Sequence, residues 1–240
     1  MKVLALDTSN QAMSVAVMVD GQLMAEELLN RKKTHSEQLL PTISRLLQAN
    51  ALAPSDLDRV AVADGPGSYT GIRIAVTTAK TLAATLNLEL VGVSSLAVLA
   101  ANVTRTRNLI VPLMDARRQN VFAGGYQWDR GQLVNVLVDR HLALSQLLDQ
   151  LRLLNQPVTF VGADVPQFRA TIEEALGSAA HFVDAIDALP HASRLAQLGG
   201  HAAPVSPITF VPRYLRLTEA ETNWLKTHHA ERHAPYVEKV

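Results

Sequence analysis

The order of predicted strands and helices repeats once along this chain. In each half an apolar run ends in an aspartate, at Asp7 and at Asp115. Two more strands follow, separated by Asp20-Gly21 in the first half and by Asp129-Arg-Gly131 in the second. Asp/Gly pairs of this kind are typical of hairpin turns. A helix, a strand, a second helix and a last strand then complete each half, which predicts an α/β protein of two similar lobes.

The first half is predicted to hold strands at 3–6, 13–19 and 23–28, a helix at 37–49, a strand at 59–63, a helix at 72–86, a strand at 88–93 and a short helix at 96–103. The second is predicted to hold strands at 109–114, 121–128 and 133–138, a helix at 144–154, a strand at 158–161, a helix at 167–176 and a strand at 181–184. We place the boundary in the polar stretch 102–108, which gives an N-terminal lobe over 1–103 and a C-terminal lobe with a tail over 104–240. Two βββαβαβ lobes facing a cleft, the second degenerate, predict the actin-like fold of actin, Hsp70 and sugar kinases.

Composition excludes several classes of function. The chain of 240 residues has no cysteine, so it has neither a disulfide framework nor a thiol nucleophile. Its formal net charge is zero, which argues against a protein that grips nucleic acid alone. Because it lacks an apolar run of about 18 residues and a signal-peptide pattern, we expect a cytoplasmic protein without a membrane span.

The run from Asp64 to Arg73, DGPGSYTGIR, lies between a predicted strand and a predicted helix. Gly65, Gly67 and Gly71 allow tight turns and close approach of the backbone to another group. Thr70 is predicted to cap the helix, whose free N–H groups attract anions or a docking partner. The loop matches neither the P-loop nor the dinucleotide-binding pattern. A tight turn that fixes the helix to the sheet would explain why Gly67 and Gly71 are present. It explains less well why Ser68, Tyr69 and Thr70 lie between them, and why Arg73 follows within one turn of the helix.

The turns after the two first strands have two interpretations each. Asp7, Thr8 and Ser9 form either a metal–phosphate site or a plain turn in which Asp and Ser bond their own backbone. Asp115, beside Arg117 and Arg118, belongs either to a nucleotide site or, more often for such a trio, to a surface ion pair. His228, His229 and His233 could bind a divalent ion adventitiously, although a solvated tail is favoured. We find no convincing acid, base or nucleophile.

The helix at 72–86 is rich in small residues, including Ala75, Ala79 and Ala83. Such residues let two helices approach closely, so this helix and the one at 37–49 are candidates for a protein interface. Plain packing on the sheet explains the same pattern, and the sequence does not separate the two.

Several motifs together resemble one family. They are Asp7-Thr-Ser9, His35-Ser-Glu37 with the following Leu-Leu-Pro41, the loop 65–73, Gly92-Val-Ser-Ser-Leu96, Asp115-Ala-Arg117 and Pro212-Arg-Tyr-Leu-Arg216. In this order they resemble the bacterial TsaB family, also called YeaZ, of tRNA threonylcarbamoyladenosine biosynthesis proteins. Tyr69 and Ile72 stand where the family often has Phe and Leu.

The resemblance implies an actin-like fold and a role in placing a threonylcarbamoyl group on the tRNA adenosine next to the anticodon. It implies a non-catalytic partner of the related TsaD, which holds the metal and transfers the group, together with the small ATPase TsaE. It also implies a homodimer through the N-terminal lobe when the chain is alone. Contact with tRNA is expected only through the complex, and no cofactor is expected, since a nucleotide or magnesium ion could bind only there.

One departure from TsaD supports that reading. TsaD places two metal-binding histidines four residues apart after a Gly-Val strand end, where this chain has Ser95 and Leu99. A leucine cannot ligate a metal, so we expect a scaffold without enzymatic activity, peptidase activity included. We expect it to dock through helices 37–49 and 72–86, with His35, Glu37 and the loop nearby. The rival is an actin-like ATPase or phosphotransferase using Asp7 and Asp115 around Mg-ATP. A direct tRNA binder is disfavoured, although 31–33, Arg105 and Arg107 could add basic surface.

Overall fold

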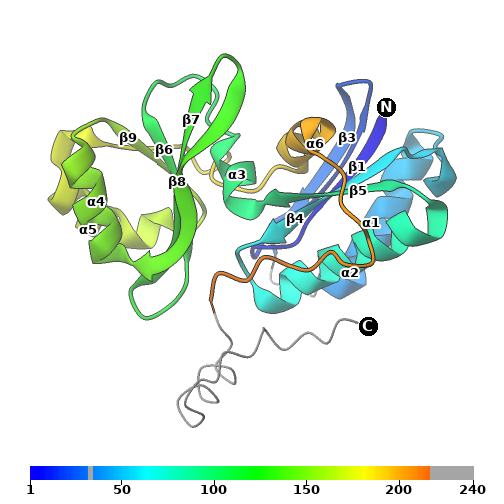
Figure 1. Cartoon of the computed structure of the whole chain (residues 1–240), viewed down its shortest axis with the longest axis horizontal. Helices are drawn as coiled ribbons and strands as arrows, with labels where there is room; N and C mark the ends of the chain where they lie inside the picture. The colour runs from blue at the N-terminus through cyan, green and yellow to red at the C-terminus, as the bar shows by residue number, and fades with distance from the viewer. Residues whose placement is uncertain (32–34, 217–240) are drawn as a thin grey trace, which may run out of the picture.

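The computed structural model describes residues 1–31 and 35–216, and they form two α/β lobes side by side (Figure 1). The first lobe contains a five-stranded sheet in the order β3-β2-β1-β4-β5. Its elements are β1 (Lys2–Asp7), β2 (Met13–Val19), β3 (Gln22–Leu29), α1 (His35–Ala49), the short 3-10 helix η1 (Pro54–Asp56), β4 (Arg59–Gly65), α2 (Tyr69–Leu86), β5 (Glu89–Ser94) and α3 (Ser95–Ala100).

The second lobe repeats this topology, with strand order β10-β9-β6-β7-β8. Its elements are β6 (Leu109–Asp115), β7 (Asn120–Asp129), β8 (Gln132–Ala143), α4 (Leu144–Leu154), β9 (Val158–Val161), α5 (Val165–Leu176), the 3-10 helix η2 (Gly177–Ala179) and β10 (Ala180–Phe182). The helix α6 (Ala192–His201) follows these elements in the chain. In each lobe the first strand pairs antiparallel with the second and parallel with the fourth. The predicted duplicated βββαβαβ order, and with it the actin-like fold, is confirmed.

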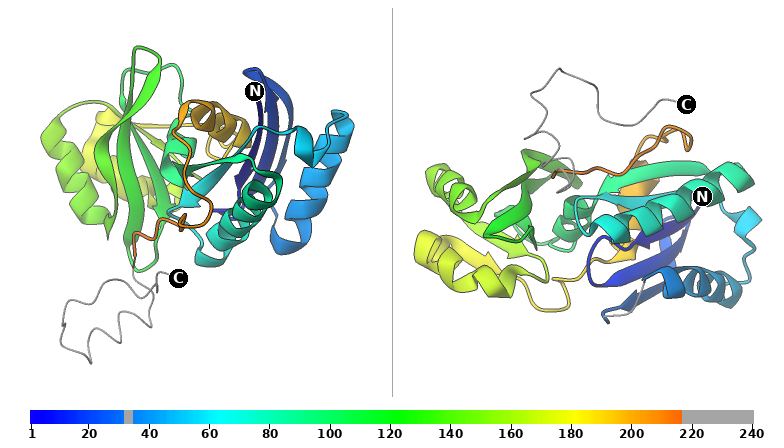
Figure 2. Two further views of the ribbon diagram at one scale, coloured as in Figure 1. Left: turned by 45° about the vertical axis from the view of Figure 1, so that its right-hand side comes forward. Right: turned by 90° about the horizontal axis from the view of Figure 1, so that it is seen from below.

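Alternation along β1 and β4 explains how the first sheet is buried on both faces. Leu4, Leu6, Val60 and Val62 point toward α1 and α2. Their neighbours on the opposite side, such as Val3 and Ala61, face α6. In the second lobe α4 and α5 cover one face, and α3 from the first lobe packs on the other. Figure 2 shows the two sheets with their helices from two further sides.

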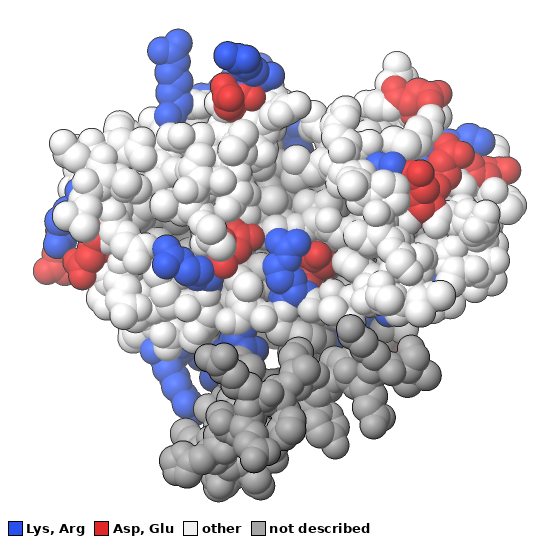
Figure 3. Space-filling model, in the orientation of Figure 1, with Lys and Arg blue, Asp and Glu red and all other residues white. Residues whose placement is uncertain are grey.

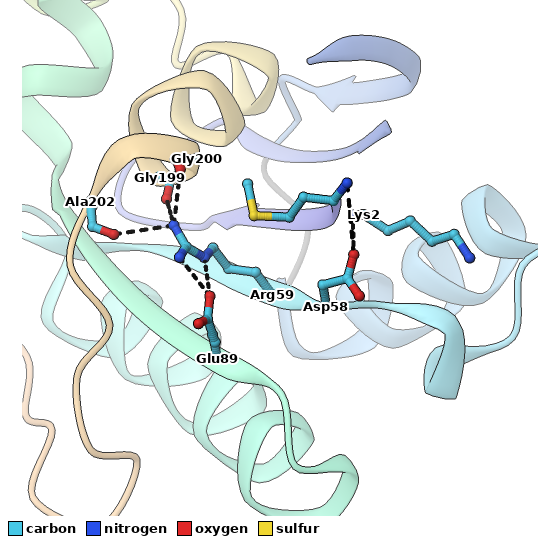
Figure 4. Close-up of polar contacts among 8 residues, drawn as sticks. Lys2, Asp58, Arg59, Glu89, Gly199, Gly200 and Ala202 are labelled. Carbon is cyan, nitrogen blue, oxygen red and sulfur yellow. Dashed lines mark hydrogen bonds and ion pairs between the residues drawn. The ribbon is translucent and has the colours of Figure 1, made fainter. Parts of the chain in front are cut away.

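Helix α6 is missing from the sequence-based prediction. Although it follows the predicted boundary at residues 103/104, it packs on the first sheet, and the division into lobes stays a prediction. Two long-range contacts hold its ends. The Glu26 carboxylate accepts from Ser193 N at 3.0 Å and from Ser193 Oγ at 2.9 Å. At the other end Arg59 donates to the carbonyls of Gly199, at 2.6 Å, Gly200 and Ala202, and it pairs with Glu89 (Figure 4). Both contacts stabilise α6, because the positive end of a helix dipole attracts a carboxylate and its negative end attracts a guanidinium group.

After α6 the chain forms an extended strap, residues 202–216. The strap leaves α6, passes along the edge of the first sheet beside α2, and ends near the second lobe (Figure 1). Val205 N donates to Leu90 O at 2.8 Å, and Lys80 Nζ donates to Phe210 O at 2.6 Å. At its end Arg216 donates to Ala116 O of the second lobe at 3.1 Å. The strap therefore connects both lobes across the side of the molecule that holds the glycine loop.

Some predictions fall on residues that are not described. They are the histidines of the tail, at 228, 229 and 233, and residues 32 and 33 of the basic stretch 31–33. Among the described residues, none of the helices is both long enough and apolar enough to cross a bilayer.

Candidate functional site

The glycine loop after β4 packs directly on the turn that follows β1. Ser68 N donates to Ser9 O at 2.7 Å, and Thr8 Oγ1 donates to Gly71 O at 2.6 Å. A Cβ atom on Gly67 would lie 2.2 Å from Ser9 O, and one on Gly71 would lie 2.1 Å from Thr8 O. These two glycines therefore serve the close approach of one backbone to another, which is the turn-fixing interpretation of the loop.

Helix α2 begins earlier than predicted. Ser68, rather than Thr70, is its N-cap, because the Ser68 hydroxyl accepts from Gly71 N at 3.3 Å. The assignment of Thr70 as the cap was therefore wrong, and Thr70 lies exposed in the first turn. Arg73 donates to the Tyr69 hydroxyl at 2.6 Å. Tyr69, Thr70 and Arg73 are therefore exposed at the start of the helix, whereas Ile72 packs into the core of the first lobe.

Asp7 faces the interior of the first lobe. The residue is fully buried, and its Oδ1 accepts from Ser9 N at 2.8 Å and from Ser9 Oγ at 2.7 Å. Burial raises the pKa of its carboxyl group, against the opposing effect of the Ser9 bonds. Its Oδ2 has no partner within the described residues, but that atom is shielded from solvent, and Asp7 does not line the cleft between the lobes. Such a carboxylate does not fit a magnesium–phosphate site in that cleft. His35 lies nearby, with Nε2 2.9 Å from Asn10 O, and steadies the same turn.

Asp115 has the opposite environment. Its residue is exposed; its Oδ1 accepts from Arg117 N at 2.8 Å, and its own N–H donates to Asp164 Oδ2 at 2.9 Å. The two aspartates that the sequence paired as a nucleotide site thus differ, one sealed in the core and the other in an open turn. Within the described residues no group of three His, Cys, Asp or Glu side chains is placed to hold a metal ion.

A cleft of about 880 Å³ separates the lobes at the glycine loop. It is lined by residues of the two first turns, the loop and the strap, among them Ser9, Pro66, Ser68, Tyr69, Asp115, Arg117, Asp164, Arg213, Tyr214 and Arg216. The structure therefore brings Ser9, Gly67, Ser68, Tyr69, Thr70 and Asp115 together, whereas the predicted Glu37 lies exposed on α1.

The strap is bound to the end of β4 through contacts between Arg213, which lines the cleft, and Asp64. Arg213 N donates to Asp64 O at 2.7 Å, and the Arg213 guanidinium pairs with Asp64 Oδ2 at 3.3 Å. Tyr214 stacks on Tyr69 with ring centroids 5.1 Å apart. Burial raises the pKa of Asp64 to about 6, because desolvation outweighs the nearby Arg213 charge. Asp64 and the strap residues were given no individual role from sequence, although the motif 212–216 was the available signal.

The three alanines proposed for a partner surface are in the core. Ala75, Ala79 and Ala83 are at most 1% exposed and pack against the first sheet. Their assignment to a docking face is wrong, because small side chains here allow α2 to lie close to its own sheet. Ser95 and Leu99 are buried as well: Ser95 Oγ accepts from Gly65 N at 3.2 Å, and Leu99 joins the core between α3 and the second sheet.

Comparison with known proteins places this fold. The family model for TsaD, tRNA N6-adenosine threonylcarbamoyltransferase, matches residues 22–224. The tRNA threonylcarbamoyladenosine biosynthesis protein TsaB of Bacillus subtilis (strain 168) is 40% identical over 95% of this chain and 99% of its own length. The Escherichia coli (strain K12) protein of that name is 35% identical over 54% of this chain and 56% of its length. The solved structure of YeaZ from Pseudomonas aeruginosa superposes with a TM-score of 0.74 at 28% identity, covering 89% of this chain and 99% of that one.

Two duplicated lobes, joined across a cleft that carries a glycine loop and a turn aspartate, define a protein of the actin-like ATPase fold. Within that class the chain belongs to the TsaB family of tRNA threonylcarbamoyladenosine biosynthesis proteins.

Proposed function

We propose that this chain is a non-catalytic subunit in the biosynthesis of threonylcarbamoyladenosine in tRNA, and that it supports the transfer by docking on a TsaD-type catalytic subunit. The observation that carries the proposal is the burial of Ser95 and Leu99. At the positions where TsaD has its pair of metal-binding histidines, this chain has side chains committed to packing. A TsaE-type ATPase would join through the complex.

The geometry of the two turn aspartates favours this function over the ATPase or phosphotransferase alternative. An ATP-handling cleft of this fold would need a carboxylate open to the metal–phosphate group. Asp7 is sealed behind the loop and its Oδ1 is already bonded to Ser9. A nucleotide or magnesium ion would accordingly belong to the assembled complex rather than to this chain alone.

The outward face of α1 and α2 is the docking surface that we propose. On α2 this face consists of the exposed residues Thr77, Thr81, Ala84 and Thr85, none of which is charged. Tyr69, Thr70 and Arg73 are exposed at the start of the helix, beside the cleft. On α1, Leu40 is 59% exposed, and Pro41 and Ser44 are exposed beside it. A surface with few charges and small side chains suits the centre of a protein interface, where charged residues are depleted. In the absence of the partner we expect two copies of the chain to pair through this face.

The test uses a pair of exposed residues on α2. Thr77→Arg with Thr81→Arg places two large charges on the proposed face without entering the core. Thr171→Arg, at an exposed position of α5 in the other lobe, is the matched control. Binding to the TsaD protein of the same organism is measured by calorimetry. We expect the double variant to lose binding by at least tenfold and the control to bind as wild type. Undiminished binding by the double variant would refute the surface, and micromolar Mg-ATP binding by the isolated chain would favour the ATPase.

A further inference from the structure

A basic and aromatic surface lies at the mouth of the cleft. Four of its residues line the cleft: Tyr69 from the first turn of α2, Arg117 from the turn after β6, and Tyr214 and Arg216 from the strap. The fifth is Arg73 of α2, which contacts Tyr69. We call these five residues the cleft-mouth surface. The two tyrosine rings are stacked and remain 46% and 44% exposed. The strap and the two lobes thus each contribute side chains to one continuous surface.

The positive charges of this surface are available to a ligand. Arg73 contacts the Tyr69 ring and donates a hydrogen bond to the Tyr69 hydroxyl. Arg216 donates one hydrogen bond, to Ala116 O. Within the described residues, the Arg117 guanidinium takes part in none of the hydrogen bonds or ion pairs. Figure 3 shows basic side chains along the lower edge of the second lobe, beneath the acidic ones.

The acidic groups of the cleft are already engaged. Asp115 accepts from Arg117 N, Asp164 accepts from Asp115 N, and Asp64 is paired with Arg213. The Asp64–Arg213 pair is neutral overall, whereas Asp115 and Asp164 keep their charges because their donors are backbone N–H groups. Arg73, Arg117 and Arg216 outnumber these two carboxylates, so the mouth keeps a net attraction for an anion.

We propose that the cleft-mouth surface binds a single-stranded segment of RNA, with the arginines on phosphates and the tyrosine pair against a base. Arginine clusters that track a backbone and aromatic rings that stack on bases are the usual means of holding single strands. This inference rests on the proposed function, in which the complex acts on tRNA, and assigns part of the RNA contact to the subunit that does no chemistry. The residues differ from Arg105 and Arg107, which the sequence suggested.

A strand fits this surface better than a free nucleotide does. The rings and the guanidinium groups are spread along an open cleft that reaches from α2 to the second lobe, and Asp7 is not open to a metal–phosphate group. The chain has no net charge, so we expect weak binding by the chain alone and stronger binding when the partner adds its own surface.

The experiment measures binding of a short fluorescent single-stranded RNA by anisotropy, with the full chain alone and with its TsaD complex, from about 50 to 200 mM salt. The variants are Arg117→Ala, Arg216→Ala and Tyr214→Ala, with Tyr214→Phe retaining the ring. Arg152→Ala, on α4 away from the cleft, is the matched loss of one charge. Mg-ATP is titrated in a parallel arm. Gel filtration first establishes whether each variant forms the complex.

We expect each cleft-mouth arginine variant to reduce the slope of log affinity against log salt by about 0.7, the value for one phosphate on a single strand. Tyr214→Ala should weaken binding roughly 5- to 150-fold, and Tyr214→Phe should bind as wild type. Unchanged slopes, equal losses in the Arg152 control, or binding of Mg-ATP in place of RNA would overturn the proposal. Because gel filtration reports docking separately, a complex that forms but shows no such changes refutes this inference while leaving the proposed function in place.

Discussion

Replacing Asp64 with asparagine should make the protein more stable at neutral pH. The Asp64 side chain is 6% exposed, and its Oδ1 has no hydrogen-bond partner among the described residues. Burial raises its pKa from 3.8 to about 6. The folded state therefore holds the proton more tightly than the unfolded state does, and between those two pH values it binds more protons. Stability must fall as pH rises through this window.

The size of the effect follows from the shift. A difference of about two pKa units corresponds to about 3 kcal/mol of unfolding free energy. The wild type has lost this stabilisation once the pH exceeds about 6. Asparagine has nearly the same shape and carries no charge, so Asp64→Asn avoids this loss. For a chain of this length about 3 kcal/mol raises the melting temperature by roughly 6–12 °C.

The assay is urea unfolding of wild type and Asp64→Asn at a series of pH values from about 4 to 8. We expect the difference in unfolding free energy to be near zero at the acidic end and to grow to its plateau above about pH 6. Asp149→Asn, at an exposed position of α4, serves as the control and should show no such growth. A difference that stays constant with pH, or a variant less stable than wild type at pH 8, would refute the reasoning.

Three further predictions concern stability. Gly71→Ala should cost about 3 kcal/mol or more in urea unfolding, since its Cβ would meet Thr8 O at 2.1 Å, whereas Gly131→Ala, with open space around it, should cost about 1 kcal/mol. Leu99→Ala should lower the unfolding free energy by about 2–5 kcal/mol, because the side chain is buried between α3 and the second sheet; a loss below 1 kcal/mol would contradict that placement. The Glu26 carboxylate raises the pKa of His191, so the stabilisation from this contact should be full below about pH 6.5 and lost at higher pH, and His191→Gln should remove that part of the pH dependence in thermal melts.

Local patterns were sufficient to predict most of the fold. The helix at 144–154 was placed correctly at both ends because its leucines recur at helical spacing. The duplicated order followed from two apolar strands that end in aspartate. Helix α6 was missed even though Ala192, Leu195, Ala196 and Gly199 follow the same spacing. Gly199 and Gly200 have low helix propensity, and the contact with Arg59, 140 residues away from Gly199 in sequence, supplies what local propensity lacks.

The candidate site was predicted less well, for a physical reason. Glycines at 67 and 71 indicated that something approaches the loop closely, but the sequence could not show that this was the backbone of Thr8 and Ser9. Small residues on α2 are compatible with a protein interface and with a close helix–sheet contact. The burial of these alanines against the first sheet shows that they serve the helix–sheet contact. The roles of Asp64, Arg213 and Tyr214 depend on a strap that returns from the end of the described chain, and such long-range contacts leave no local pattern.

The most direct test of the account asks whether this subunit does chemistry. Threonylcarbamoyladenosine formation is measured in a reaction reconstituted with TsaD, TsaE and tRNA, using a variant with Asp7→Asn and Asp115→Ala. We predict product at the wild-type rate as long as gel filtration shows the complex with TsaD, because in the proposed function neither carboxylate takes part in the transfer. Loss of product from an intact complex would contradict the account and would show that a carboxylate of this chain is needed for the reaction.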